Sequence, residues 1–421
     1  MGLLEGKRIL LGVAGGIAAY KSPELVRRLK EAGADVTVAL TEAGAQFVSP
    51  LALEVVSEHP VARSLWEPLQ TSRGSRIAHT DLGLDADLIV LAPATADLIG
   101  KIRHGLADDL LTTAIMACRT PVLVCPAMNT EMLDNPLVVA NLDALRALPR
   151  YTFLEPGVGL LACGIVGRGR QPDPPEIIEA AAAVLAPKDL VGLRIVLSAG
   201  PTHEPLDPVR VLANRSTGTM GFSLARSLAA RGAELDLVAG PVNLRTPVGV
   251  ARRHDVNTAA EMHATIERLW PMTDVLVMTA AVADFRPAHP QTLKIKKGGD
   301  PNSPTTPAPT LELERTVDIL STMSQKPDRA RVTLVGFAAE THDVLDYART
   351  KLEKKGLDFV IANDVSTPGV GFGPGDNAGW ILSRDPDGAG SPGVIALPRA
   401  PKDRFADAIA THLAPRLRRP S

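Results

Sequence analysis

Residues 8–21 read RILLGVAGGIAAYK, and this stretch predicts the fold class of the first half of the chain. Its apolar run, residues 8–13, is typical of a buried strand, and the glycine pair that follows is typical of a tight turn into a helix. Residues 23–30 carry apolar side chains at helical spacing, and Gly33 stands where a helix C-terminal cap belongs. A second apolar run, residues 35–40, completes a strand–helix–strand unit. This order predicts a parallel sheet covered by helices.

The second half of the chain repeats this alternation after a break. An alanine-rich helical stretch ends at Pro187, and an apolar strand begins at Leu193, so we place a domain boundary at Lys188. We therefore expect an α/β protein with two doubly wound three-layer domains, residues 1–188 and 189–421. The expected strands are residues 8–13, 35–40, 87–92 and 121–125 in the first half and 193–197, 234–238, 274–279, 332–337 and 358–362 in the second. The second half also has helical patterns at residues 222–231, 258–270 and 342–355.

Composition excludes several classes of protein. Of the 421 residues, 45% are hydrophobic and 22% charged, which is typical of a globular chain. The first 188 residues hold 17 basic and 21 acidic side chains, leaving 28 and 26 for the rest, so neither half is a basic nucleic-acid platform. No apolar run is long enough to span a membrane. The three cysteines lack zinc or disulfide spacing, which favours a reducing, cytoplasmic compartment.

Two polar segments are expected at the surface. Residues 298–309, GGDPNSPTTPAP, cannot bury a core and predict a mobile loop. Residues 385–393 are interpreted as a hairpin turn.

Small residues mark a candidate phosphate site in the first half. Gly15 and Gly16 join a strand to a helix, where free backbone N–H groups favour an anion, although a glycine pair is equally compatible with tight packing and no ligand. Ala94, Thr95 and Asn129 follow two later strands. Ligands of open α/β sheets bind at such strand ends, so we expect these residues at one site.

His79 and Cys163 are the candidate reactive side chains of the first half. His79 lies just upstream of a strand, where a lone histidine is more often structural than catalytic. Cys163 lies in LLACGIVGRGR, a glycine-rich composition that predicts a flexible flap, and a thiol there suits proton delivery. Cys118 and Cys125 lie in apolar context and fit a packing role.

These segments together resemble flavoproteins that oxidatively decarboxylate cysteine residues, specifically the phosphopantothenoylcysteine decarboxylase family. The shared motifs are GGIAAYK from Gly15, the His79 segment, APATADLI from Ala92, PAMN from Pro126 and the ACGxxGxGR flap. The resemblance implies a flavodoxin-like domain that binds FMN, with cofactor contacts from Gly15, Gly16, Ala94 and Thr95. It also implies that His79 serves oxidation and decarboxylation, Asn129 holds the substrate carboxylate and Cys163 protonates the enethiolate. Ala14 departs from the family, which usually has a serine beside the flavin phosphate.

The second half has its own candidate site. Hydroxyl residues in NRSTGTMG, residues 214–221, precede a helix and favour phosphate. Asp284 and the lysines from Lys294 follow one strand and suit magnesium-assisted phosphoryl chemistry, although the lysines are equally compatible with a solvated loop flank. Lys351 and Lys355, four residues apart, share one helix face. The GxGxxG spacing of dinucleotide folds is absent here, which weighs against a dehydrogenase.

This half resembles phosphopantothenate–cysteine ligase, commonly fused behind the decarboxylase in bacteria. The shared segments are SAGPTHEPLDPVR from Ser198, NRSTGTMG, AAVADFRP from Ala280, KIKK from Lys294, VGFAAET from Val335 and IANDVS from Ile361. The resemblance implies a Rossmann-like domain that uses CTP and Mg²⁺ to activate 4'-phosphopantothenate as an acyl cytidylate, which cysteine then attacks. The implied nucleotide contacts are Asp284, Lys294, Asp318, Ile319, Phe337, Lys351 and Lys355, and the implied Mg²⁺ ligand is Asp284.

The resemblance also implies roles for three further groups of residues. Asn214 would stabilise the acyl cytidylate, Lys294 would neutralise charge as pyrophosphate leaves, and Arg210 would contact the phosphopantothenate phosphate.

Thr316 and Val317 depart from the usual Asn-Pro of an Asn-Pro-Asp-Ile segment, which puts base selectivity in doubt. Thr219 replaces a common lysine, which puts triphosphate affinity in doubt.

Two other functions are compatible with parts of the sequence. A flavin- or nicotinamide-linked oxidoreductase built from two dinucleotide-binding units predicts NAD(P)H turnover without CTP. A regulatory flavoprotein predicts bound flavin without turnover, and the presence of His79 and Cys163 argues against it. The family resemblance implies small-molecule substrates, no nucleic-acid or membrane partner, and a homo-oligomer of trimeric flavin domains and dimeric ligase domains.

Overall fold

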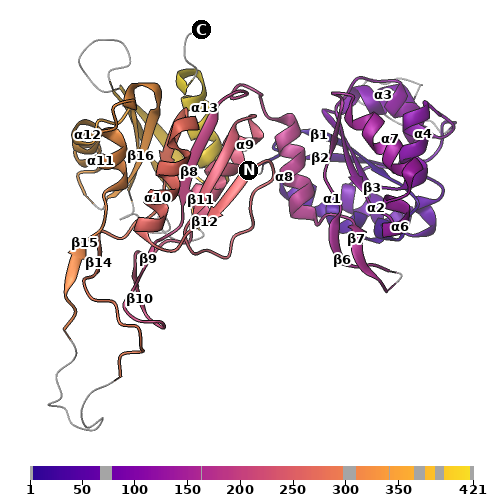
Figure 1. Ribbon diagram of the computed structural model, residues 1–421. Coiled ribbons are helices and arrows are strands. Elements are labelled where there is room, and N and C mark those ends of the chain that lie inside the picture. Colours follow the sequence, from indigo (N-terminus) through magenta and orange to yellow (C-terminus); the bar gives the residue numbers. More distant parts are fainter. Residues whose placement is uncertain are drawn as a thin grey trace. The chain divides into compact units, whose positions relative to one another are not determined.

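The computed structural model describes residues 3–66, 78–162, 164–296, 310–340, 342–364, 375–384 and 393–417. The chain divides into two compact units, residues 1–186 and 187–421, each built on its own sheet (Figure 1). Cys163, the whole segment 298–309 and residues 385–392 of the turn expected at 385–393 lie outside the described residues.

The first unit has a five-stranded parallel sheet in the order β2-β1-β3-β4-β5. This is the flavodoxin-like order of a doubly wound sheet. The strands are β1 (Arg8–Val13), β2 (Asp35–Leu40), β3 (Leu88–Ala94), β4 (Val122–Pro126) and β5 (Tyr151–Phe153). The four strands expected from the sequence are present, and β5 is additional.

Helices cover both faces of this sheet because successive strand residues point to opposite sides. Leu10 and Leu91 belong to a buried cluster with apolar side chains of α3, α4, α5 and α7, while α1 packs against α2 and α8. The helices are α1 (Ser22–Glu31), α2 (Pro50–Ser57), α3 (Ala78–Asp85), α4 (Ala96–His104), α5 (Leu110–Met116), α6 (Thr130–Leu133), α7 (Pro136–Arg146) and α8 (Pro174–Leu185). A 3-10 helix, η1 (Ile17–Lys21), directly precedes α1. The glycine-rich flap is an antiparallel hairpin of β6 (Gly157–Leu160) and β7 (Val166–Arg170).

The second unit has an eight-stranded sheet in the order β12-β11-β8-β13-β16-β17-β18-β19. The first six strands are parallel and follow the Rossmann order, and the last two are antiparallel. They are β8 (Arg194–Ala199), β11 (Glu234–Ala239), β12 (Arg252–Asp255), β13 (Val275–Met278), β16 (Thr333–Glu340), β17 (Phe359–Asp364), β18 (Asn377–Ser383) and β19 (Gly393–Ala400). The sequence predicted five of these strands.

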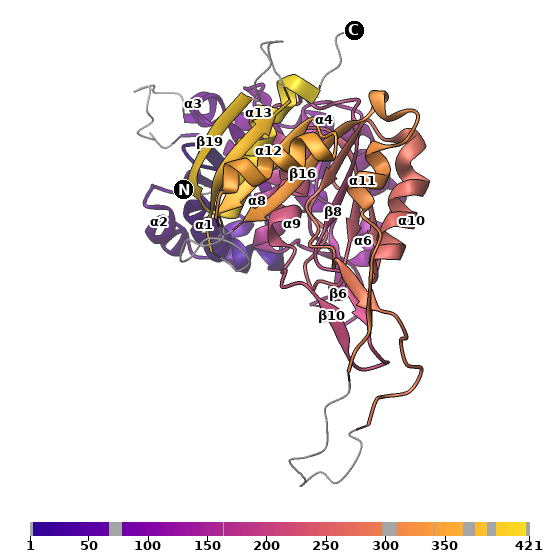
Figure 2. The same cartoon turned by 90° about the vertical axis from the view of Figure 1, so that its left-hand side faces the viewer.

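Two groups of helices bury the two faces of the second sheet (Figure 2). Ile195 and Leu197 share a cluster with α9 (Thr219–Ala230) and α13 (Lys402–Leu417). Val196 instead shares a cluster with α10 (Ala259–Leu269), α11 (Ile319–Ser324) and α12 (Val344–Lys354). Two small antiparallel sheets, β9 (His203–Pro205) with β10 (Val211–Ala213) and β14 (Phe285–Pro287) with β15 (Leu313–Arg315), contact each other and project from the same end of this unit (Figure 1).

Candidate active sites at the carboxyl ends of the two sheets

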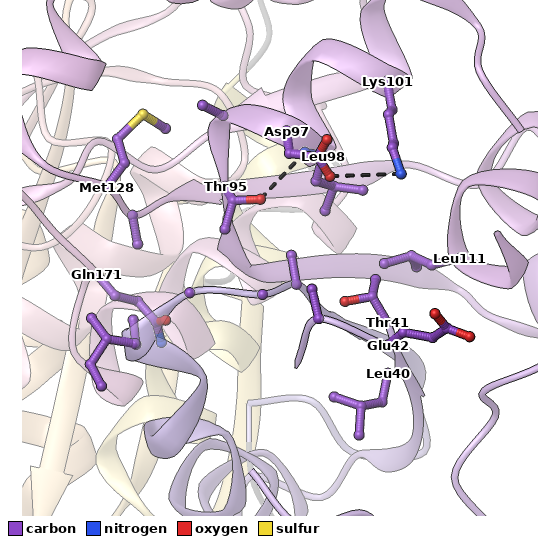
Figure 3. Close-up of a pocket in the computed structure, with 18 of the residues that line it drawn as sticks. Leu40, Thr41, Glu42, Thr95, Asp97, Leu98, Lys101, Leu111, Met128 and Gln171 are labelled. Atoms are coloured by element: carbon purple, nitrogen blue, oxygen red, sulfur yellow. Dashed lines mark hydrogen bonds and ion pairs between the residues drawn. The ribbon is translucent and has the colours of Figure 1, made fainter. Parts of the chain in front are cut away.

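A cavity of about 1100 Å³ opens where β1, β2, β3 and β4 end in the first unit (Figure 3). This volume is in the range of small-molecule and cofactor sites. The expected residues Gly15, Gly16, Thr95 and Asn129 all line it, as do Leu160 to Ala162 at the tip of the β6–β7 flap. Ala94, the residue before Thr95, is fully buried at the end of β3 and does not line the cavity.

The glycine turn requires glycine because the backbone approaches its neighbours closely. A Cβ built on Gly15 would lie 2.3 Å from Cβ of Ala43, and one on Gly16 would lie 3.2 Å from Cγ2 of Thr95. Bare backbone at this position leaves room for a phosphate beside N–H groups at the start of η1.

Two further helix starts border the cavity. Thr95 caps α4 by accepting a hydrogen bond at Oγ1 from the N–H of Leu98, over 3.3 Å. Asn129 caps α6 by accepting at Oδ1 from the N–H of Glu131, over 2.7 Å. Helix starts carry partial positive charge, so these two caps add to the turn's preference for an anionic ligand. The residues present therefore fit a phosphorylated cofactor such as a flavin mononucleotide.

Gln171 is a cavity residue that the sequence did not single out. Its side chain is buried, at 2% exposure, and neither Nε2 nor Oε1 has a hydrogen-bond partner among the described residues. It lies with Met128 at one end of the cavity, while Glu42 and Lys101 lie at the other (Figure 3). Buried amides are normally bonded, so this carboxamide points to a polar ligand as its missing partner. The sequence did not indicate a binding role for Gln171, because it is a single polar residue between a strand and Pro172 with no motif around it.

Neither candidate reactive residue, His79 or Cys163, is among the described residues that line this cavity. His79 lies in the first turn of α3 and does not line the described part of the cavity. Cys163 lies outside the described residues, one position after the lining residue Ala162. Cys125 is fully buried in β4, and burial raises the pKa of its thiol well above the usual range, so it stays protonated and fits a packing role.

A second cavity, of about 740 Å³, opens at the carboxyl ends of β8, β13 and β16. It gathers most of the residues expected at the second site: Asn214, Asp284, Asp318, Ile319, Phe337, Lys351 and Lys355. The turn before α9 lines this cavity. Gly218 in that turn has φ +74° and packs against Gly200 and Val242. The hydroxyls of Ser216, Thr217 and Thr219 surround this helix start, an arrangement that suits phosphate.

The two helix lysines have different environments. Nζ of Lys351 donates to the carbonyl of Phe337 over 2.5 Å, and burial lowers the pKa of this lysine. Nζ of Lys355 lies 2.8 Å from Oδ2 of Asp318. Burial alone would raise the pKa of Asp318, but the hydrogen bonds from Lys355 and Ser321, together with the charge of Lys355, outweigh burial and lower that pKa. Lys355 and Asp318 therefore form a charged pair at the cavity wall.

Arg210 and Lys294 do not line the described cavity. Arg210 donates through Nε and Nη2 to Oδ2 of Asp207, and Lys294 is an exposed residue on the segment beside it. Asn214 does line the cavity, and its Nδ2 donates to the carbonyl of Val282 over 2.9 Å.

The cavity also includes three polar residues that were not singled out individually. Asn363 and Asn377 on the neighbouring strands β17 and β18 are buried, and neither Oδ1 has a hydrogen-bond partner among the described residues. Lys402, at the start of α13, is buried beside them and burial lowers its pKa. Buried acceptors without donors fit a ligand that offers hydroxyl or amino groups. Asn363 belongs to the IANDVS segment, one of the segments that indicate the ligase family. Asn377 and Lys402 lie in a strand and a helix that carry no such motif.

Comparison with known families places each unit in a class. Residues 2–186 match the model of the family described as "Flavoprotein", and residues 190–416 match "DNA/pantothenate metabolism flavoprotein C-terminal domain". The fold and the two sites thus define a two-unit α/β flavoprotein of pantothenate metabolism.

Full-length relatives identify the particular family. The "Coenzyme A biosynthesis bifunctional protein CoaBC" of Vibrio cholerae serotype O1 is 44% identical over 408 residues, covering 96% of this chain and 97% of that protein. Proteins of the same name from Bacillus subtilis (strain 168) and Escherichia coli (strain K12) are 43% and 45% identical, each over 91% of this chain and 92% of the relative. The chain belongs to the family of coenzyme A biosynthesis bifunctional proteins.

Two solved structures are similar to the separate units. The crystal structure of the C-terminal domain of Coenzyme A biosynthesis bifunctional protein CoaBC is 35% identical, covering 55% of this chain and 98% of that one, with a TM-score of 0.44. A PPC decarboxylase mutant complexed with pantothenoylaminoethenethiol is 32% identical, covering 42% of this chain and 96% of that one, with a TM-score of 0.37. Among the described residues, no helix combines the length and apolar character needed to cross a membrane.

Proposed function

We infer that the chain is a bifunctional enzyme that ligates cysteine to 4'-phosphopantothenate and then decarboxylates the product to 4'-phosphopantetheine. The observation that carries this inference is the pair of separate anion-favouring cavities, one at the end of each sheet, in a chain that matches both family models. The order of the two steps follows from chemistry, because the ligase must first supply the cysteine adduct whose carboxyl group the other unit removes.

The first unit is proposed to bind FMN through the glycine turn and the starts of α4 and α6. When bound, FMN would take two electrons from the substrate thiol and return them after carbon dioxide leaves. In this scheme Asn129 orients the substrate carboxylate, His79 serves the oxidation and decarboxylation, and Cys163 delivers a proton to the enethiolate carbon. The strands β6 and β7 flank Cys163 in the sequence and Leu160 to Ala162 line the cavity, so the flap is proposed to bring this proton donor to the cavity and to exclude water.

The second unit is proposed to use the Mg²⁺ complex of CTP as its co-substrate. A carboxylate oxygen of 4'-phosphopantothenate attacks the α-phosphorus, the bond to the β-phosphate oxygen breaks, and pyrophosphate leaves. The cysteine amine then attacks the acyl carbon, loses a proton and expels CMP. Asn214 would hold the acyl cytidylate, while Lys351, Lys355, Asp318, Ile319, Phe337 and Asp284 line the nucleotide cavity. Lys294 would neutralise charge on the leaving pyrophosphate and Arg210 would contact the pantothenate phosphate.

Three further properties belong to this proposal. We place the domain boundary at Lys188, within the linker between α8 and β8. The enzyme is expected to act in the cytoplasm. It is expected to assemble through trimeric flavin units and dimeric ligase units.

The test is an assay of the purified protein with 4'-phosphopantothenate, cysteine, CTP and Mg²⁺, read out as pyrophosphate, carbon dioxide and 4'-phosphopantetheine. All three products are expected, together with a flavin absorbance band. Cys163→Ser is expected to release carbon dioxide without completing 4'-phosphopantetheine. NAD(P)H turnover without a CTP requirement would instead favour the oxidoreductase.

A further inference from the structure

A single buried carboxylate joins the two segments that carry Arg210 and Lys294. The side chain of Asp207 is fully buried and belongs to the turn before β10. The segment from Gln291 to Ile295 docks on this turn, and the N–H of Gln291 donates to the carbonyl of Leu206 over 2.9 Å. Lys294 therefore stands on a segment whose position depends on the turn.

The two carboxylate oxygens of Asp207 accept hydrogen bonds from different groups. Oδ1 accepts from the backbone N–H groups of Val209 and Arg210, both over 2.9 Å, and so shapes the turn. Oδ2 accepts from the N–H of Ile295 over 3.0 Å and from the Arg210 guanidinium, and so ties the neighbouring segment to the turn. Nη2 of Arg210 closes the link by donating to the carbonyl of Ile295 over 2.8 Å.

We propose that Asp207 is a positioning residue of the ligase site, whose Oδ2 holds the Lys294 segment so that this lysine can reach the leaving pyrophosphate. The inference rests on the ligase function proposed above. Ile295 immediately follows Lys294 in the chain, and its N–H and carbonyl are both bonded to the Asp207–Arg210 pair, so the lysine backbone is fixed at its own peptide bond. Geometry of this kind determines rate because small misplacements of a reacting group cause large losses.

The charge state of Asp207 supports this role. The side-chain bonds from Arg210 hold the pKa of this carboxyl well below its usual range, with backbone donors assisting against burial. Asp207 is therefore ionised throughout the neutral range, and both oxygens remain acceptors.

Asp207→Asn is expected to keep the hydrogen bonds within the turn and to remove the one to Ile295. An asparagine has one oxygen, so it can shape the turn or accept from Ile295 but cannot do both. Because two backbone donors compete with one, we expect the oxygen to stay with the turn and the Ile295 N–H to lose its acceptor.

The experiment measures ligase kinetics and amide hydrogen exchange in the full-length protein. Asp207→Asn is expected to lower kcat for pyrophosphate release about tenfold, with KM for CTP within about twofold, and to speed exchange at Ile295. In a Lys294→Ala background the same change is expected to cost less than about threefold, because the lysine that it positions is gone. Asp236→Asn is the matched control: this buried carboxylate holds Arg252 and His254 on the β11–β12 edge, and its loss should leave ligase kcat unchanged.

Three outcomes separate the possibilities. An Asp207→Asn enzyme with wild-type kcat and a protected Ile295 amide would overturn the inference. So would equal losses in the wild-type and Lys294→Ala backgrounds, because they would indicate general destabilisation. If the wild-type protein makes no pyrophosphate from CTP, the ligase function itself is wrong.

Discussion

Gln171 shows how one residue can link folding to ligand binding. Its amide is buried without a partner among the described residues, and leaving such a group unbonded costs about 1–3 kcal/mol. An apolar side chain of similar size avoids this cost. The free protein and the flavin-bound protein are therefore expected to respond to its replacement in opposite directions.

Gln171→Leu is expected to raise the melting temperature of the flavin-free protein and to weaken FMN binding about tenfold, because a lost hydrogen bond is worth about 1 kcal/mol or more. Thermal unfolding and flavin fluorescence titration measure the two effects. Gln325→Leu, an exposed position in the second unit, is the control and should change neither. Unchanged FMN affinity would mean that the amide does not contact the cofactor.

Lys351 gives the ligase site a pH dependence. Burial lowers its pKa, so the ammonium loses its proton below the ordinary lysine value of about 10.4. We expect KM for CTP to rise as pH increases through that lowered pKa, because the cavity loses a positive charge. Lys351→Arg, which stays charged, should remove the rise, and a rise that persists in this variant would assign it to another group.

The lowered pKa of Lys351 also makes the free energy of unfolding depend on pH, in the direction opposite to nucleotide affinity. Between the lowered folded pKa and the ordinary value, the unfolded chain binds more protons at Lys351 than the folded chain. Its contribution to stability therefore increases with pH in that window, while nucleotide affinity falls.

Among the elements, hydrophobic periodicity predicted the parallel strands except β5 and β12, and several of the helices between them. The runs at residues 8–13 and 35–40 coincide with β1 and β2, because strands buried on both faces are almost continuously apolar. The strand at residues 151–153 was not predicted because it is short and only partly buried. The segment around His79 forms a helix, α3, although its sequence shows little separation of polar and apolar faces.

The sites were predicted where a motif occupies one continuous segment at a strand end. The turns around Gly15 and Asn214 could be identified because phosphate-favouring composition is local. Gln171, Asn377 and Lys402 could not be, because the fold brings them to their cavities from distant segments. The confirmed predictions are the fold class, the family and the bifunctional assignment, while the individual residue roles stay predictions.

Gly15→Ala tests the turn between β1 and η1. The added Cβ would lie 2.3 Å from Ala43 Cβ, so the turn must shift, and we expect a loss of about 1–3 kcal/mol in the free energy of unfolding together with loss of bound flavin. Denaturant unfolding and the flavin absorbance band measure both. Gly100→Ala in α4 meets only an ordinary contact at 3.8 Å, so it should stabilise the protein by up to about 1 kcal/mol and keep the flavin. Equal behaviour of the two variants would contradict the packing argument.

At the scale of the whole molecule, two sheets with separate cores carry two separate sites. Disabling one site should therefore leave the chemistry of the other intact. Asn214→Asp is expected to stop formation of the cysteine adduct but to release carbon dioxide normally when 4'-phosphopantothenoylcysteine is supplied. Loss of both activities would indicate that the units depend on each other.

The bifunctional assignment can be tested by following the carboxyl carbon of cysteine. Cysteine labelled at that carbon is incubated with the protein, 4'-phosphopantothenate, CTP and Mg²⁺, and labelled carbon dioxide is compared with pyrophosphate. We expect one labelled carbon dioxide for each pyrophosphate, and none when CTP is omitted. Release of label without CTP, or pyrophosphate with no labelled gas, would contradict the claim that this chain performs both steps.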